Sequence, residues 1–121
     1  MSLSVKIDVD NAVRVHLGGR LDSNTAPELD KSLKELLAPG THRAVVFDLA
    51  QLEYISSAGL RSIVRVNKVM TAVGGHTLLV NLRSDVEKVF NMVKVLPAKF
   101  IFRSIGELNE FLSLARKGSN E

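Results

Sequence analysis

The chain has 121 residues, of which 45% are hydrophobic and 24% charged, as expected for one globular domain with a single hydrophobic core. It contains no cysteine, which excludes a disulfide scaffold, a thiolate metal site and a cysteine nucleophile. A net charge of +3 with one tyrosine and no tryptophan lacks the basic clusters and stacking aromatics of nucleic-acid binders.

The sequence shows no signal for a membrane span or for export. No apolar run in it approaches the roughly 18 residues of a membrane span. The N-terminal residues alternate like a strand and lack the apolar core of a signal peptide. We therefore expect a cytoplasmic protein that does not contact membranes. We also expect one domain over residues 1–116 and a frayed tail over residues 117–121.

The N-terminal segment has the pattern of a β-hairpin. Residues 3–18 alternate between apolar and polar side chains on both sides of the turn pair Asp10-Asn11. The pair Gly18-Gly19 follows and is expected to end the hairpin.

Helical and strand patterns then alternate along the chain. Three of the expected helices begin with a capping box, a serine or threonine three residues before a glutamate. The expected elements are a helix from Thr25 to before Pro39-Gly40, a strand at Ala44–Leu49, a helix at Ser57–Val73, a strand at Thr77–Val80, a helix from Ser84, a strand at Phe100–Phe102 and a last helix from Ser104. The order ββαβαβαβα predicts a single α/β domain with a mixed sheet and about four helices, because strand–helix–strand units pair their strands in parallel.

The sequence carries no recognisable catalytic or cofactor motif. His16, His42 and His76 lie in separate segments without the spacing of a metal-binding pair. A nucleophile elbow, a phosphate-binding loop and a dinucleotide fingerprint are all missing. We expect no cofactor, no metal and no enzymatic activity.

The segment Tyr54–Arg61 lies where a buried strand gives way to a helix, at the carboxyl edge where α/β proteins place their sites. Ser56 or Ser57 is suited to cap this helix by accepting a bond from a backbone N–H. Gly59 would let the helix begin close against the sheet. Helix capping is one interpretation of the two serines; exposure of one of them to another protein is the other.

Helical periodicity places Arg61, Arg65 and Lys68 in a narrow strip, which we call the basic strip, and Ser57 beside it. A phosphate on Ser57 would meet the free N–H groups of the helix terminus and Arg61. The alternative for the basic strip is an ordinary solvated face.

Two motifs at a specific separation, GRLDSNTA at Gly19–Ala26 and DLAQLEYISSAGL at Asp48–Leu60, resemble the STAS domain (sulfate transporter and anti-sigma factor antagonist). A free-standing domain of this size is most similar to the bacterial anti-sigma factor antagonists. The resemblance implies that the unphosphorylated protein binds an anti-sigma factor, a serine kinase with a histidine-kinase-like ATPase fold, and frees a sigma factor. Phosphorylation of one serine would release the antagonist, and a PP2C-type phosphatase would restore it.

The family pattern is Asp-Ser-Ser/Thr-Gly-Leu, with the first serine as phosphate acceptor. Aligned on Gly59-Leu60, the acceptor is Ser57. Ser56 occupies the position of the family aspartate and is the less favoured acceptor, and Ala58 replaces the second hydroxyl residue.

The resemblance also assigns residues to the partner surface. Asp22 matches an acidic position close to the acceptor, while a turn or cap before the first helix is its structural alternative. The residues expected to contact the partner are Asp22, Ser56, Ser57, Ala58, Gly59, Arg61 and Arg65. Because Ser56 departs from the family pattern, a second function stays open: an unphosphorylated STAS scaffold subunit in a lipid-transport ATPase or a signalling complex.

Overall fold

The computed structural model of the chain describes residues 3–9, 12–34, 44–93, 101–102 and 110. In chain order these residues form β1 (Leu3–Val9), β2 (Val13–Leu21), α1 (Ala26–Lys34), β3 (Ala44–Ile55), α2 (Ser57–Ala72), β4 (His76–Val80), α3 (Ser84–Val93) and β5 (Ile101–Phe102). The predicted α/β class and the element order up to β5 are confirmed. The expected last helix lies outside the described residues except for Glu110, and so does the tail at 117–121.

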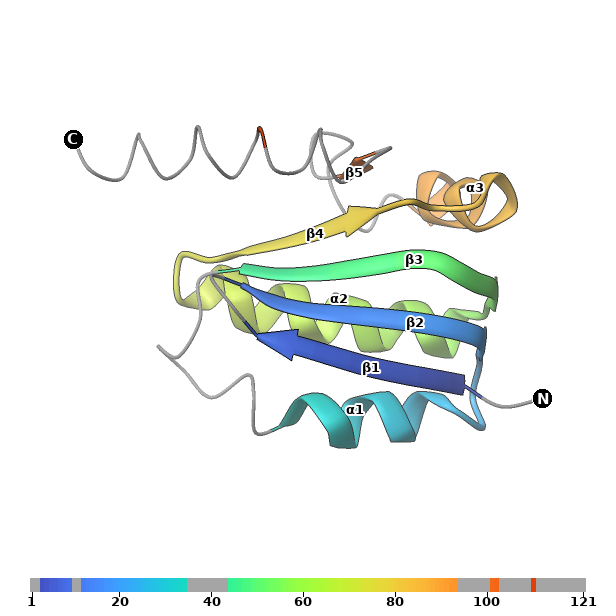
Figure 1. The fold of residues 1–121 in the computed structure, drawn as a ribbon, viewed down its shortest axis with the longest axis horizontal. Helices are drawn as coiled ribbons and strands as arrows, with labels where there is room; N and C mark the ends of the chain where they lie inside the picture. Colours follow the sequence, from blue (N-terminus) through green and yellow to red (C-terminus); the bar gives the residue numbers. More distant parts are fainter. Residues whose placement is uncertain (1–2, 10–11, 35–43, 94–100, 103–109, 111–121) are drawn as a thin grey trace.

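The strands form one mixed sheet in the order β1-β2-β3-β4-β5 (Figure 1). β1 runs antiparallel to β2, whereas β2, β3, β4 and β5 are parallel neighbours. Because β2 and β3 are parallel, their carboxyl ends meet at the same edge of the sheet. Their register pairs Leu21 with Ile55 there, which brings together the two segments that lead into α1 and α2.

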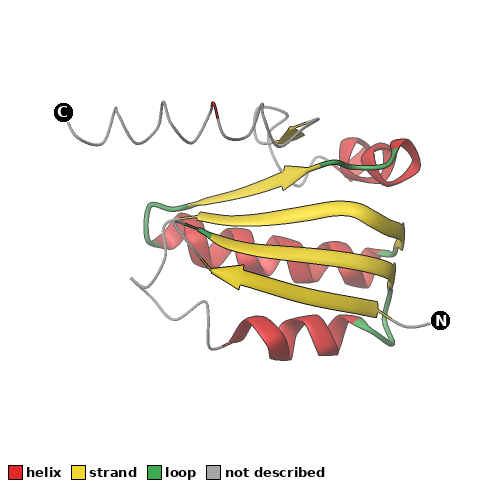
Figure 2. Cartoon of the chain, viewed as in Figure 1, coloured by secondary structure: helices red, strands yellow, loops and turns green. Residues whose placement is uncertain are grey.

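The main hydrophobic core lies against the face of the sheet that α1 and α2 cover (Figure 2). Apolar residues recur at helical spacing on both helices, and the resulting stripes are buried against alternate residues of β2 and β3. α3 adds Val86 and Phe90 to the same core. A smaller buried cluster on the other face contains Ala12, Ala44, Val46, Leu78 and Val80. The part of the chain that the structure describes contains no helix long and apolar enough to cross a membrane.

The glycine pair after the predicted hairpin does not end β2, so this prediction was wrong. The strand continues to Leu21 through two irregularities in its pairing with β3, between His16 and Gly18 and between Gly19 and Arg20. Gly19 has a φ of 87°, a conformation that residues other than glycine rarely adopt. Gly19 therefore supplies a backbone conformation that suits a β-bulge inside the strand.

β3 is also longer than predicted. It extends past Leu49 to Ile55, with Gln51, Glu53 and Tyr54 exposed and Leu52 buried. The added part is half solvated and more polar than the buried run that precedes it. It carries the chain to the sheet edge where α2 begins.

Candidate functional site

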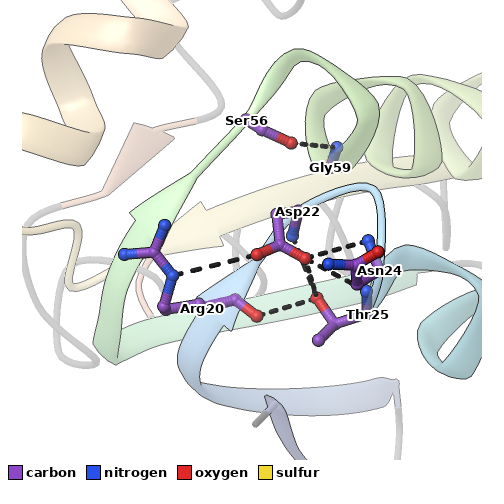
Figure 3. Close-up of polar contacts among 6 residues, drawn as sticks. All are labelled: Arg20, Asp22, Asn24, Thr25, Ser56 and Gly59. Atoms are coloured by element: carbon purple, nitrogen blue, oxygen red, sulfur yellow. Dashed lines mark hydrogen bonds and ion pairs between the residues drawn. The ribbon is translucent and has the colours of Figure 1, made fainter. Parts of the chain in front are cut away.

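Two loops meet at the carboxyl edge of β2 and β3. The Ser56 N–H donates a 2.9 Å hydrogen bond to the Leu21 carbonyl oxygen, and this bond continues the pairing of the two strands by one residue. The β2–α1 loop and the start of α2 are thus fixed next to each other (Figure 3). Because Asp22 directly follows Leu21, the same bond places Asp22 near Ser56, as the resemblance predicted.

Ser56 is the N-cap of α2. Its backbone is extended (φ −100°, ψ 176°), and its hydroxyl oxygen accepts a hydrogen bond from the Gly59 N–H at 3.4 Å. Its carbonyl oxygen accepts the Leu60 N–H at 2.9 Å, the first bond of the helix. The side chain is only half exposed. The hydroxyl group of Ser56 therefore has a structural task, as the capping interpretation predicted.

Ser57 is the first residue of α2 and is exposed. Among the described residues, no side chain or backbone group forms a hydrogen bond with its hydroxyl group. The helix start leaves the first backbone N–H groups without intrahelical partners, so an anion on Ser57 would find donors beside it. Ala58 follows and is half buried.

Gly59 is buried in the first turn of α2, against the ends of β2 and β3. A Cβ atom at this position would lie 2.7 Å from Leu21 Cγ, 2.8 Å from the Leu21 carbonyl oxygen and 3.0 Å from Ile55 Cγ1. Real Cβ atoms essentially never make contacts as short as the first two, so any other residue here would force the surrounding atoms to shift. The expectation that Gly59 lets the helix begin close against the sheet is explained by these contacts, and a direct partner contact at Gly59 stays a prediction.

Asp22 organises the turn between β2 and α1. Its Oδ1 accepts hydrogen bonds from the N–H groups of Asn24 at 3.0 Å and Thr25 at 3.1 Å. The Arg20 Nε lies 3.8 Å from the other carboxylate oxygen (Figure 3). These bonds demonstrate the turn role that the sequence left as an alternative, whereas partner contact through Asp22 stays a prediction.

Thr25 does not form the predicted capping box with Glu28. Its hydroxyl group donates to the Arg20 carbonyl oxygen at 2.8 Å and accepts the Asp22 N–H at 2.9 Å. The buried hydroxyl is thus used across the turn, because the bulged end of β2 brings these backbone groups within its reach.

The pKa of Asp22 is lowered by its surroundings. Desolvation by partial burial raises the pKa of this carboxyl, but the backbone N–H bonds from Thr25 and Asn24, the Thr25 hydroxyl and the Arg20 guanidinium outweigh it and hold the pKa below its ordinary value. Asp22 is therefore an anion over the whole physiological pH range. The β2–α1 loop therefore carries a negative charge at the same sheet edge at which α2 begins.

Arg20 and Tyr54 form a second feature of this edge that the sequence did not predict. The guanidinium carbon of Arg20 lies 4.1 Å from the centre of the Tyr54 ring, within the range of a cation–π contact. Both side chains are partly exposed. The β2–β3 register, which pairs these two residues, is the signal that could have identified them.

The basic strip lies on the exposed face of α2, as predicted for Arg61, Arg65 and Lys68. Arg65 Nη1 donates a 2.8 Å hydrogen bond to Asp30 Oδ2 of α1, so this residue links the two helices. Arg61 lies one turn after Ser57, and no acidic residue of the described chain forms an ion pair with it. Ser57 and Arg61 therefore share one exposed helix face.

A polar network on the other face of the sheet was not predicted. His16 Nδ1 lies 3.2 Å from Asp48 Oδ2, and His16 Nε2 lies 3.2 Å from Asp8 Oδ2. The Asn81 side-chain amide donates to Asp48 Oδ1 at 3.2 Å. Among the described residues, no three His, Cys, Asp or Glu side chains are placed so that together they could hold a metal ion. The network joins β1, β2 and β3 to the loop after β4, away from Ser57.

A family model described as the STAS domain matches residues 4–108. The chain belongs to the STAS domain family. A curated relative of this STAS domain is BtrV of Bordetella bronchiseptica, which is named as an anti-sigma factor antagonist. It is 37% identical over 84 residues, and the alignment covers 69% of this chain and 72% of BtrV.

Solved structures share the fold of this STAS domain. A structure from Thermotoga maritima, also named as an anti-sigma factor antagonist, is 27% identical with a TM-score of 0.75 and covers 89% of this chain and 92% of its own. The antagonist SpoIIAA in its unphosphorylated form is 18% identical with a TM-score of 0.70, covering 95% of this chain and 98% of its own. Phosphorylated SpoIIAA of Bacillus gives a TM-score of 0.71 at 17% identity and covers 92% of this chain and 99% of its own. The fold of this STAS domain is therefore also found in a phosphorylated protein.

Proposed function

We propose that this STAS domain protein is an anti-sigma factor antagonist whose partner binding is switched by phosphorylation of Ser57. One observation carries the proposal. Of the two neighbouring serines, Ser56 uses its hydroxyl group to cap α2, whereas Ser57 presents an exposed hydroxyl group without a partner in the described chain. A kinase can reach Ser57 without disturbing a bond that holds the fold together.

The surroundings of Ser57 suit a switch based on charge. A phosphate adds about −1.5 to −2 charges at neutral pH. It would lie at the positive end of the α2 dipole and one turn before Arg61. These groups stabilise the phosphate locally, so the modified protein keeps its fold while the charge of its exposed face changes.

The partners follow from the family and from this chemistry. BtrV supports an anti-sigma factor as the binding partner. We infer that this anti-sigma factor is the serine kinase, that a PP2C-type phosphatase removes the phosphate, and that the protein works in the cytoplasm as a binding protein without enzymatic activity. Residues 1–116 would form the functional unit.

The acceptor assignment is tested by incubating the protein with its cognate anti-sigma factor kinase and ATP and mapping the phosphate by mass spectrometry. We expect one phosphate on Ser57. The variant Ser57→Ala should incorporate none, and the matched variant Ser56→Ala should still be phosphorylated on Ser57. Phosphate incorporation that persists in Ser57→Ala would contradict the assignment.

The switch is tested by the variant Ser57→Asp. Because the hydroxyl group of Ser57 is exposed and makes no hydrogen bond within the described chain, the free energy of unfolding of this variant should stay within about 0.5 kcal/mol of that of the wild type. The affinity of this variant for the anti-sigma factor, measured by calorimetry, should be at least about tenfold lower than that of the unphosphorylated wild type. Loss of folding would show that Ser57 is mainly structural, and unchanged affinity would show that the site is not at the interface.

A further inference from the structure

A groove runs between α1 and α2, beside the face that carries Ser57. The two helices contact each other and leave a hollow of about 250 Å³. This volume is below the roughly 300–1,000 Å³ typical of small-molecule sites, and suits one inserted side chain. The hollow, which we call the α1–α2 groove, is lined by Asp30, Leu33, Lys34, Ser62, Arg65, Val66 and Val69.

The floor of the α1–α2 groove is apolar. Leu33 and Val66 are buried, and they belong to the main core. Val69, one turn after Arg65, is 37% exposed and is one of the few large apolar side chains of the described chain that faces water. An apolar side chain inserted here would therefore cover surface that is in contact with water.

Ser62 provides a polar group in the same groove. This residue is 1% exposed, and its hydroxyl oxygen has no hydrogen-bond partner in the described chain. Most buried polar atoms in proteins have a partner. A donor or acceptor that accompanies the inserted side chain would satisfy Ser62.

The surroundings of the groove are basic. Lys34 and Arg65 line it, and the exposed basic residues on the two helices are Lys31, Lys34, Arg61, Arg65 and Lys68. The only acidic residues within α1 and α2 are Glu28 and Asp30, and Asp30 is bound by Arg65. The other four cations form no ion pair with the described residues. This excess of positive charge favours a negatively charged occupant.

We propose that the α1–α2 groove docks an acidic segment of a protein partner, which inserts one apolar side chain against Leu33, Val66 and Val69 and hydrogen-bonds Ser62. The proposal rests on the proposed function in taking the anti-sigma factor as that partner. Ser57 lies on α2 ahead of the basic strip. A phosphate there would repel an acidic segment bound along the same helix, which gives a direct electrostatic reason for release.

The test uses the full chain labelled with ¹⁵N and a short synthetic peptide of glutamates around one central leucine, titrated in an NMR experiment. We expect saturable shifts centred on the amides of Ser62, Val66 and Val69. The exposed-surface variant Lys68→Glu should weaken binding at least about fivefold. The matched charge reversal at exposed Lys88 of α3, Lys88→Glu, should change the peptide affinity less than about twofold.

A peptide with glycine in place of leucine should bind at least about fivefold more weakly. Equal binding of the glycine peptide, equal loss in Lys88→Glu, or shifts centred on the open sheet face would overturn the groove assignment. Groove shifts that depend on protein concentration without peptide would assign the groove to a second copy. Stronger groove binding to phosphatidylglycerol vesicles would assign it to a lipid surface.

The outcome is separable from that of the proposed function, because the titration contains neither kinase nor ATP. A negative titration overturns the groove assignment and leaves the Ser57 switch intact. If the chain is not phosphorylated and does not bind the anti-sigma factor, the switch fails while the peptide result stands.

Discussion

The β2–α1 junction and the β3–α2 junction lie side by side at the carboxyl edge of the sheet, but different interactions hold them. Between β2 and α1, the side chains of Asp22 and Thr25 are engaged with neighbouring backbone groups. Between β3 and α2, close packing of Gly59 and one cap bond from Ser56 hold the chain, and Ser57 is left exposed. The first junction uses the side chains of Asp22 and Thr25 for structure, and the second leaves the hydroxyl group of Ser57 without a partner in the described chain.

The contrast shows that the residues that fix the backbone at this edge are different from the residue that is exposed there. A modifiable residue must be accessible, yet its backbone must stay in place for a kinase and a partner to recognise it. The β2–α1 junction and Gly59 provide the fixed frame, while Ser57 adds an exposed hydroxyl group without a hydrogen-bond partner in the described chain. Three substitutions test this division, from the largest expected effect to the smallest.

The packing at Gly59 is tested by Gly59→Ala. The added Cβ would meet the Leu21 carbonyl oxygen at 2.8 Å, so the start of α2 must move away from the sheet. We expect a loss of about 2–3 kcal/mol in the free energy of unfolding, measured in urea. The control Gly18→Ala, whose Cβ would meet Gln51 Cβ at 3.3 Å, should lose less than about 1 kcal/mol. Equal stability of Gly59→Ala and the wild type would break the comparison.

The hydrogen-bonded junction is tested by Thr25→Val, which keeps the shape of the side chain and removes its hydroxyl group. The Asp22 N–H and the Arg20 carbonyl oxygen would lose their shared partner. Urea unfolding should show a loss of about 1–2 kcal/mol. The same change at exposed Thr71 of α2 should stay within about 0.5 kcal/mol. A similar loss in the free energy of unfolding at both positions would mean that the hydrogen bonds of the Thr25 hydroxyl group do not stabilise the fold.

The charge of Asp22 is tested by Asp22→Asn, which can keep the accepting oxygen and removes the negative charge. Because the folded-state pKa is lowered, the carboxylate stabilises the fold above its ordinary pKa, and this stability is lost as the pH falls through the folded-state value. The stability gap between the wild type and the variant should therefore narrow from about pH 6 to about pH 3. This difference in the free energy of unfolding should be smaller than the loss caused by Thr25→Val. A difference that does not change with pH would contradict the lowered pKa of Asp22.

Local patterns in the sequence predicted much of the fold. The alternation in residues 3–9 and the helical stripe at Ser84–Val93 predicted β1 and α3, because each depends on burying one face of its own element. The pair Gly18-Gly19 was interpreted as a break, since a bulge within a strand depends on the neighbouring strand.

The site could be predicted only in part for the same reason. The sequence limited the cap of α2 to Ser56 or Ser57, and helical periodicity placed Ser57 beside the exposed basic strip; the structure assigns the cap to Ser56. The Thr25 hydroxyl had backbone partners in the folded turn that no local spacing shows. The contacts of His16 with Asp8 and Asp48 depend on the strand register across two pairings.

The bond from the Ser56 N–H to the Leu21 carbonyl oxygen has a consequence for how the sequence at this edge can change over evolution. It uses backbone atoms, which every residue except proline supplies at position 56. An aspartate or a serine can therefore occupy this position, each able to cap α2, while the two junctions keep their alignment. Position 56 can in this way differ in its chemistry while Ser57 keeps its place as the first residue of α2.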